Sequence, residues 1–353
     1  MLGWSKKPCD ANEYKSYLTL HCKVTLFHYF TFIFSKKNSS VKFVESRSEV
    51  MSYYANCLKV SDECPVSATP FGYAPSLPAN ATLLAIFCVI TIAQLIQGFR
   101  YQTWGFTATF ILGSLCEVIG YIGRVMMASS PWSHVGLTLQ NLFLTVGPLF
   151  FLNGVFLCYT NIIETYSTTL SRINPATYPL ISTSVTLLPF ILLTSGSLLQ
   201  STSAVGFTPS FYLSTGSNVV IAGLCFQLLS MICFGVLHAD YKIQVRAYPE
   251  QLNAYAENTR ASRRFMYFYI ALPAAFLTVG VSVVYRMAVL GQGWGMSFMK
   301  NEVGFICLEG ITVAIAGYAL SVVHPGYVFR PTEYINHKSA EIITDDKLEE
   351  AWN

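Results

Sequence analysis

The chain has 353 residues and a formal net charge of +3. Hydrophobic residues make up 53% of the sequence and charged residues only 12%, against about 25% charged residues in soluble domains. This composition is typical of a membrane protein. The sequence has no long basic run with interleaved aromatic residues, so nucleic acid is not expected as a partner.

Seven segments contain the roughly 20 mainly apolar residues that a membrane-spanning helix needs. They are residues 82–99, 105–127, 137–160, 178–199, 217–237, 267–290 and 303–323. The sequence therefore predicts an all-α membrane protein with seven transmembrane helices. The apolar stretch from Val24 to Phe34 has only 11 residues, which is too short for an eighth span.

The distribution of Lys and Arg predicts the orientation of these helices, because cytoplasmic loops retain positive charge. The loops after the first, third and fifth spans, together with the C-terminal tail, carry ten Lys and Arg residues, whereas the other loops carry only Lys300. The N-terminus is therefore expected outside and the C-terminus in the cytoplasm. This divides the chain into an extracellular segment, residues 1–79, a seven-helix domain, residues 80–327, and a short cytoplasmic tail, residues 328–353.

The N-terminal segment raises two further hypotheses. Residues 1–50 are polar and basic and lack a complete signal-peptide pattern, so translation is hypothesised to start at Met51 rather than Met1, or residues 1–50 to be dispensable. Cys57 and Cys64 lie in the segment that is expected outside, where an oxidising compartment permits a disulfide. Two free thiols are the alternative.

Glu117 and Arg124 are charged residues inside the second span. Offsets of three, four and seven residues place Glu117, Gly120, Tyr121 and Arg124 on one face of a helix. Because charge in the hydrocarbon region is costly, this face should contact protein or a wet cavity. Glu117 and Arg124 are about 10 Å apart along the helix axis, so their partners are expected on other helices.

Prolines interrupt three of the spans and a fourth proline follows the last span. Pro148, Pro189 and Pro273 lie within the third, fourth and sixth spans, where each removes a backbone hydrogen bond and favours a kink. The sequence His324-Pro325-Gly326 is suited to ending the seventh span.

Several motifs in series resemble those of the fungal lipid-translocating exporter family. The chain has Tyr73–Asn80 with Gln97–Trp104, then Glu117–Arg124, and finally His324–Gly326, in the family's order. The resemblance also includes Gln140, Pro148, Gly223–Gln227, Tyr285–Arg286, Glu302 and Glu309. The chain departs from the family pattern in the fourth span, where residues 181–196 offer only Ser and Thr in place of an acidic residue and a glutamine.

This resemblance implies a seven-span protein of the plasma membrane, or alternatively of the vacuole or another endomembrane. It implies the export or translocation of an amphiphilic lipid, such as a sphingoid long-chain base or a sterol-like toxicant, without a cofactor. The chain has no GxxxxGK[ST] loop, so the transport is expected to be independent of ATP. A lipid-responsive sensor or receptor is the alternative.

The intramembrane charges suggest how such a substrate is bound. Glu117 and Glu309 are candidates to hold an ammonium headgroup, while Arg124 and Arg286 are candidates to meet a phosphate or to balance the two acids. The candidate translocation residues are Glu117, Tyr121, Arg124, Gln140, Gln227, Arg286 and Glu309. The alternative is that the acids pair with the arginines and fix the helix register. A membrane hydrolase is disfavoured, because the spans lack a histidine cluster for a metal.

Overall fold

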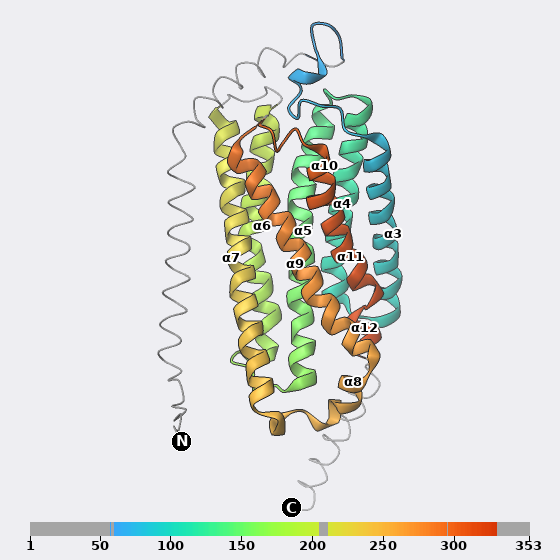
Figure 1. The fold of residues 1–353 in the computed structure, drawn as a ribbon, viewed down its shortest axis with the longest axis vertical. Helices are drawn as coiled ribbons and strands as arrows, with labels where there is room; N and C mark the ends of the chain where they lie inside the picture. Colours follow the sequence, from blue (N-terminus) through green and yellow to red (C-terminus); the bar gives the residue numbers. More distant parts are fainter. Residues whose placement is uncertain (1–56, 58–59, 205–210, 295, 330–353) are drawn as a thin grey trace, which may run out of the picture.

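A computed structural model of the chain describes residues 57, 60–204, 211–294 and 296–329. Seven membrane-spanning segments dominate it (Figure 1). The first six are α3 (Leu77–Tyr101), α4 (Trp104–Ser129), α5 (His134–Tyr166), α6 (Tyr178–Ala204), α7 (Phe211–Ala247) and α9 (Arg263–Gln292). The seventh runs through α10 (Glu302–Phe305), the π-helical turn η5 (Ile306–Ile311) and α11 (Thr312–Val322), and the short α12 (Pro325–Val328) follows.

These segments confirm the prediction of an all-α membrane protein with seven spans. The helices extend beyond the predicted apolar windows: α3 begins at Leu77 rather than at residue 82, and α7 continues to Ala247 rather than to residue 237. Short helical turns occupy the loops, namely η1 (Val66–Ala68), η2 (Pro175–Thr177), η3 (Pro249–Gln251), η4 (Ala254–Ala256) and α8 (Glu257–Ala261). Residues 1–50, including the stretch from Val24 to Phe34 and the choice between Met1 and Met51, lie outside the described residues.

Helix α5 is the central helix of the bundle. In its most apolar window 78% of the residues are buried within the protein, against 28% for α6 and for α7. It packs against α4, α6 and α9, while α3 packs on α4, and α11 packs on α9 and α3 (Figure 1). Helices at the outside of the bundle, such as α3 and α6, expose apolar side chains; Val89 and Leu180 are 66% and 71% exposed. These surfaces are suited to contact with lipid.

The loops gather at two opposite ends of the bundle. At one end, here called the disulfide face, lie residues 60–76, 130–133 and 296–301 (Figure 1). At the other end, here called the basic face, lie the α3–α4 and α5–α6 connections, residues 248–262 and α12. Cys57 and Cys64 form a disulfide at the first of these ends, with 5.9 Å between their Cα atoms.

The three prolines lie inside α5, α6 and α9, and each helix continues through its proline. At the end of the seventh span, His324 caps α12 by accepting a hydrogen bond from the Gly326 amide at its Nδ1 atom, 3.1 Å away. A side chain at Gly326 would meet Tyr101, because a Cβ atom there would lie 2.3 Å from that of Tyr101. The His-Pro-Gly motif therefore joins the end of the seventh span to the end of α3.

Candidate functional site

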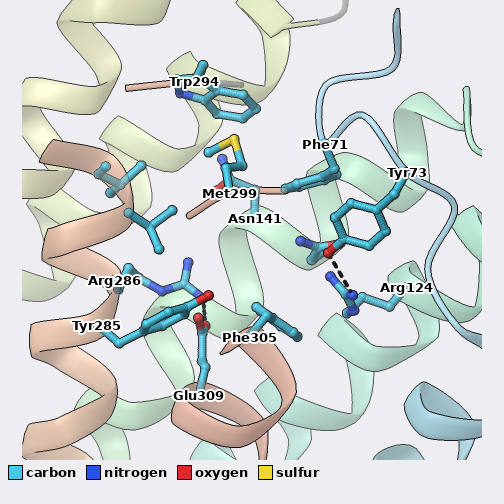
Figure 2. Close-up of a pocket in the computed structure, with 13 residues that line it drawn as sticks. Phe71, Tyr73, Arg124, Asn141, Tyr285, Arg286, Trp294, Met299, Phe305 and Glu309 are labelled. Carbon is cyan, nitrogen blue, oxygen red and sulfur yellow. Dashed lines mark hydrogen bonds and ion pairs between the residues drawn. The ribbon is translucent and has the colours of Figure 1, made fainter. Parts of the chain in front are cut away.

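A small cavity lies inside the bundle, in the half nearer the disulfide face. We call it the polar chamber, and its volume of about 50 Å³ is enough for a few water molecules. Figure 2 shows residues from four spans and from the covering loops meeting around it. The lining residues are Phe71, Tyr73, Arg124, Gln140, Asn141, Tyr285, Arg286, Val289, Leu290, Trp294, Met299, Phe305 and Glu309.

Arg124 is fully buried at one side of the polar chamber. Its Nε atom donates to Asn80 Oδ1 at 2.5 Å, and its Nη2 atom donates to Glu302 Oε1 at 3.1 Å and to the Tyr73 hydroxyl at 3.3 Å. The guanidinium carbon lies 4.0 Å from the centroid of the Phe305 ring. Arg124 Nη1 has no hydrogen-bond partner among the described residues, so the two N–H groups on this nitrogen of a buried cation have no acceptor there.

Glu302 joins the first, second and seventh spans through one carboxylate oxygen. Besides Arg124, its Oε1 atom accepts from the Ser76 amide at 2.8 Å and from Asn80 Nδ2 at 3.2 Å. The Asn80 amide also donates to the Ser76 carbonyl at 2.7 Å, and its side chain is completely buried. Asn80 therefore serves as an internal hydrogen-bonding residue, although Asn80-Ala81-Thr82 matches a glycosylation acceptor sequence.

Arg286 and Glu309 form an ion pair on the opposite side of the polar chamber (Figure 2). Both side chains are largely buried, with exposures of 14% and 7%. Arg286 Nη1 also donates to the Thr145 hydroxyl, which in turn donates to the Asn141 carbonyl of α5. Glu309 lies in the π-helical turn η5, a local widening that is frequent at functional sites.

Glu117 is buried between α4 and α5, and none of the described residues forms an ion pair with it. Its side chain is 2% exposed, and Oε1 has no hydrogen-bond partner among the described residues. A Cβ atom at Gly147 would lie 2.4 Å from this oxygen, so the missing side chain of that glycine makes room for the carboxylate. The nearby Arg286 forms its ion pair with Glu309 instead.

The other residues that the sequence predicts for the translocation site lie in different parts of the bundle. Gln140 lines the polar chamber, and its Oε1 atom is buried without a hydrogen-bond partner among the described residues. Tyr121 does not line the chamber, and its ring stacks on Phe87 with 5.6 Å between centroids. Gln227 is fully buried on α7 and does not line the chamber. The structure thus places four of the seven candidates, Arg124, Gln140, Arg286 and Glu309, in the lining of the chamber and leaves Glu117, Tyr121 and Gln227 outside it.

Two groups that sequence reasoning did not assign to the site also border the chamber. Phe71 and Tyr73 reach it from the segment before α3 (Figure 2). That segment is held near Trp132, whose Nε1 atom donates to the Cys64 carbonyl at 3.2 Å. The motif Tyr73–Asn80 indicates that the segment before α3 is part of the family pattern. Nothing in the sequence predicts that Phe71 lines a cavity.

A polar network leads from the chamber into α6 and α7. Asn141 Nδ2 donates at 3.1 Å to Gln200 Oε1, and Gln200 Nε2 donates at 2.9 Å to the Ser217 hydroxyl. Trp294, which also lines the chamber, donates from Nε1 to the same hydroxyl at 3.1 Å. The described residues contain no group of three or more His, Cys, Asp and Glu side chains suited to a metal.

Seven apolar helices around a buried set of charges define an integral membrane protein with a polar interior site. Residues 110–332 match the family model described as RTA1-like protein, and the chain belongs to this family. The family resemblance that the motifs predicted is thus confirmed.

The chain is also similar to the curated protein named sphingoid long-chain base transporter RSB1 from Saccharomyces cerevisiae. The relatives from strains Lalvin EC1118 and S288c are each 28% identical to it over 286 residues. This region covers 73% of the chain and 74% of the relative. No solved structure matches the chain.

Proposed function

We propose that this protein moves an amphiphilic lipid with an ammonium headgroup, such as a sphingoid long-chain base, across or out of a membrane without ATP. The observation that carries the proposal is the charge balance around the polar chamber. Arg124 faces Glu302, and Arg286 faces Glu309, which leaves the buried Glu117 without a paired cation among the residues that the structure describes. A third carboxylate beside two balanced pairs favours a cationic ligand.

The similarity to the sphingoid base transporter supports the same ligand class, because a sphingoid base carries one amine on a long alkyl chain. Arg124 Nη1 and Gln140 Oε1, which have no hydrogen-bond partner in the described part of the chain, suit the hydroxyl groups next to that amine. The chamber itself is too small for a lipid headgroup with its chain, so binding requires the spans around it to separate. In this proposal the structure is a closed state of the transporter.

We further infer that the disulfide face is extracellular and that the basic face is cytoplasmic, with the plasma membrane as the site of action. The count of Lys and Arg in the loops supports this orientation. A disulfide at one end agrees with an oxidising compartment on that side. Under this orientation, residues 60–76 cover the chamber from outside.

A transport assay with purified full-length protein tests the proposal. Liposomes containing the protein, a labelled sphingoid base and no nucleotide should transfer the base between leaflets faster than protein-free liposomes. Glu117→Gln should slow this transfer by about tenfold or more, since a hydrogen bond to a charged group contributes about 1.5–3 kcal/mol. Glu250→Gln, which changes an exposed acid on η3, is the matched control and should transfer at the wild-type rate.

Two outcomes would contradict the proposal in different ways. Transfer no faster than in protein-free liposomes, combined with saturable binding of the base, would favour the sensor or receptor alternative. Transfer at the wild-type rate by a correctly folded Glu117→Gln variant would instead remove Glu117 from the mechanism.

A further inference from the structure

A second cavity lies between α5, α6 and α7, in the half of the bundle nearer the basic face. Its volume is about 360 Å³, which lies within the range of roughly 300–1,000 Å³ for small-molecule sites and far above that of the polar chamber. It runs between α6 and α7 from Leu188 and Phe226 at its inner end to Tyr178 and Leu237 near the basic face. We call it the α6–α7 groove.

The groove exists because α6 and α7 pack tightly at one end only. Towards the disulfide face they meet at Gly196 and Gly216, where an added Cβ atom would lie 2.8 or 2.9 Å from the backbone of the other helix. Towards the basic face, small side chains such as Ser184 and Ser230 line the gap between the helices. These side chains are too short to fill the space that larger neighbours hold open.

The interior of the groove is apolar in its chemistry. The hydroxyl of Ser182 donates to Asn153 Oδ1, and that of Ser230 donates to the Gln227 carbonyl at 2.7 Å. These two hydroxyls are therefore already engaged with the protein. Val185 and Phe226 border the groove and are 41% and 46% exposed, so it opens on the apolar outer surface. A hydrocarbon chain fits these walls better than a polar ligand does.

The length of the groove matches one leaflet of a bilayer. Residues 178–188 of α6 and residues 226–237 of α7 line it, and ten to eleven residues of helix rise by about 15–17 Å. The hydrocarbon core of a bilayer is about 30 Å thick. A lipid chain from the leaflet at the basic face can therefore lie along the whole groove.

The ion pair of Arg172 and Asp240 lies near the end of the groove at the basic face. Arg172 precedes the lining residue Ile173, and Asp240 lies three residues after Leu237. The guanidinium donates to both carboxylate oxygens, at 2.5 and 2.8 Å, and its side chain is 56% exposed. Because Asp240 is already paired, a cationic amphiphile finds no uncompensated carboxylate here. The net charge of the pair is zero, so it matches a zwitterionic headgroup, which also has no net charge, better than a cationic one.

We propose that the α6–α7 groove is a phospholipid site. It holds one acyl chain of a zwitterionic glycerophospholipid from the leaflet at the basic face, with the headgroup beside Arg172 and Asp240. The ligand fills the space that the small side chains leave and supports α6 and α7 where they do not pack on each other. This site is separate from the polar chamber and does not depend on the proposed transport activity.

Photolabelling of the full-length protein tests this site. The protein is placed in phosphatidylcholine nanodiscs that contain a trace of phosphatidylcholine with a diazirine in one acyl chain, and the labelled peptides are identified by mass spectrometry. Labelling should concentrate on residues 178–188 and 226–237. Ser230→Phe and Ser184→Phe, one in each wall, should each lower this labelling by about tenfold or more, as expected from displacing at least two buried methylene groups.

Ser195→Phe is the matched control, because Ser195 is exposed on α6, bonds its own helix backbone and lies outside the groove. All variants are compared as monodisperse protein, and this control should label as the wild type does. Equal labelling of Ser230→Phe, Ser184→Phe and Ser195→Phe would overturn the proposal. Preferential labelling of the groove by a diazirine sphingoid base or a diazirine sterol would overturn it as well, because either result assigns the site to another lipid.

Discussion

Both arginines at the polar chamber form hydrogen bonds with residues far away in the sequence. Arg124 is held by Asn80, 44 positions earlier, and by Glu302, 178 positions later. Spacing along one helix correctly indicated that its partners belong to other helices. It could not identify them, because Glu302 lies at the start of the seventh span and only the packed bundle brings it to α4.

Removal of Glu302 should strongly destabilise the protein. Glu302→Ala leaves the fully buried Arg124 without its counter-ion, and breaking a buried pair from one side costs about 3–5 kcal/mol. Thermal unfolding in detergent should show a clear fall of the midpoint. Glu250→Ala, at an exposed position on η3, should leave the midpoint unchanged, and an equal midpoint for both variants would contradict this role of Glu302.

At the scale of elements, the seven spans were predictable and their boundaries were not. Apolar windows identify helices well because the hydrocarbon core demands about 20 apolar residues. They miss the start of α3, where Pro78 and Asn80 dilute the hydrophobicity. The π-helical turn around Glu309 likewise has no signature in residue spacing, since it departs from the helical period on which such predictions depend.

The contact between α6 and α7 yields a second stability prediction. A Cβ atom at Gly196 would lie 2.8 Å from the Val220 amide nitrogen and 2.9 Å from the Gly216 carbonyl, so the two helices would have to separate. Gly196→Ala should therefore destabilise the protein by about 1–3 kcal/mol, as overpacking does elsewhere.

The control for this prediction is Gly105→Ala in α4, because a Cβ atom there has no neighbour within 4 Å. Both variants replace a helical glycine by alanine, so helix propensity alone would favour the alanine in each. Thermal midpoints measured in the same detergent separate the effects. A midpoint for Gly196→Ala at or above that of Gly105→Ala would refute close packing at this contact.

For the molecule as a whole, the proposed orientation can be tested by labelling single introduced cysteines. Lys300 is exposed at the disulfide face, and Glu250 is exposed at the basic face. A membrane-impermeant maleimide applied to intact cells should label Lys300→Cys directly and Glu250→Cys only after permeabilisation. The wild type gives the background from its own thiols, and the reverse pattern would invert the proposed topology.

The sharing of Glu302 between three spans also has a consequence for biosynthesis. Synthesis proceeds from the N-terminus, so α3 and α4 are made long before the seventh span. Until that span arrives, Arg124 lacks its carboxylate, and Asn80 and Ser76 lack their shared acceptor. A nascent chain that stops short of residue 302 thus carries an unpaired arginine in its second helix. Synthesis of the seventh span supplies the Glu302 carboxylate that neutralises this charge.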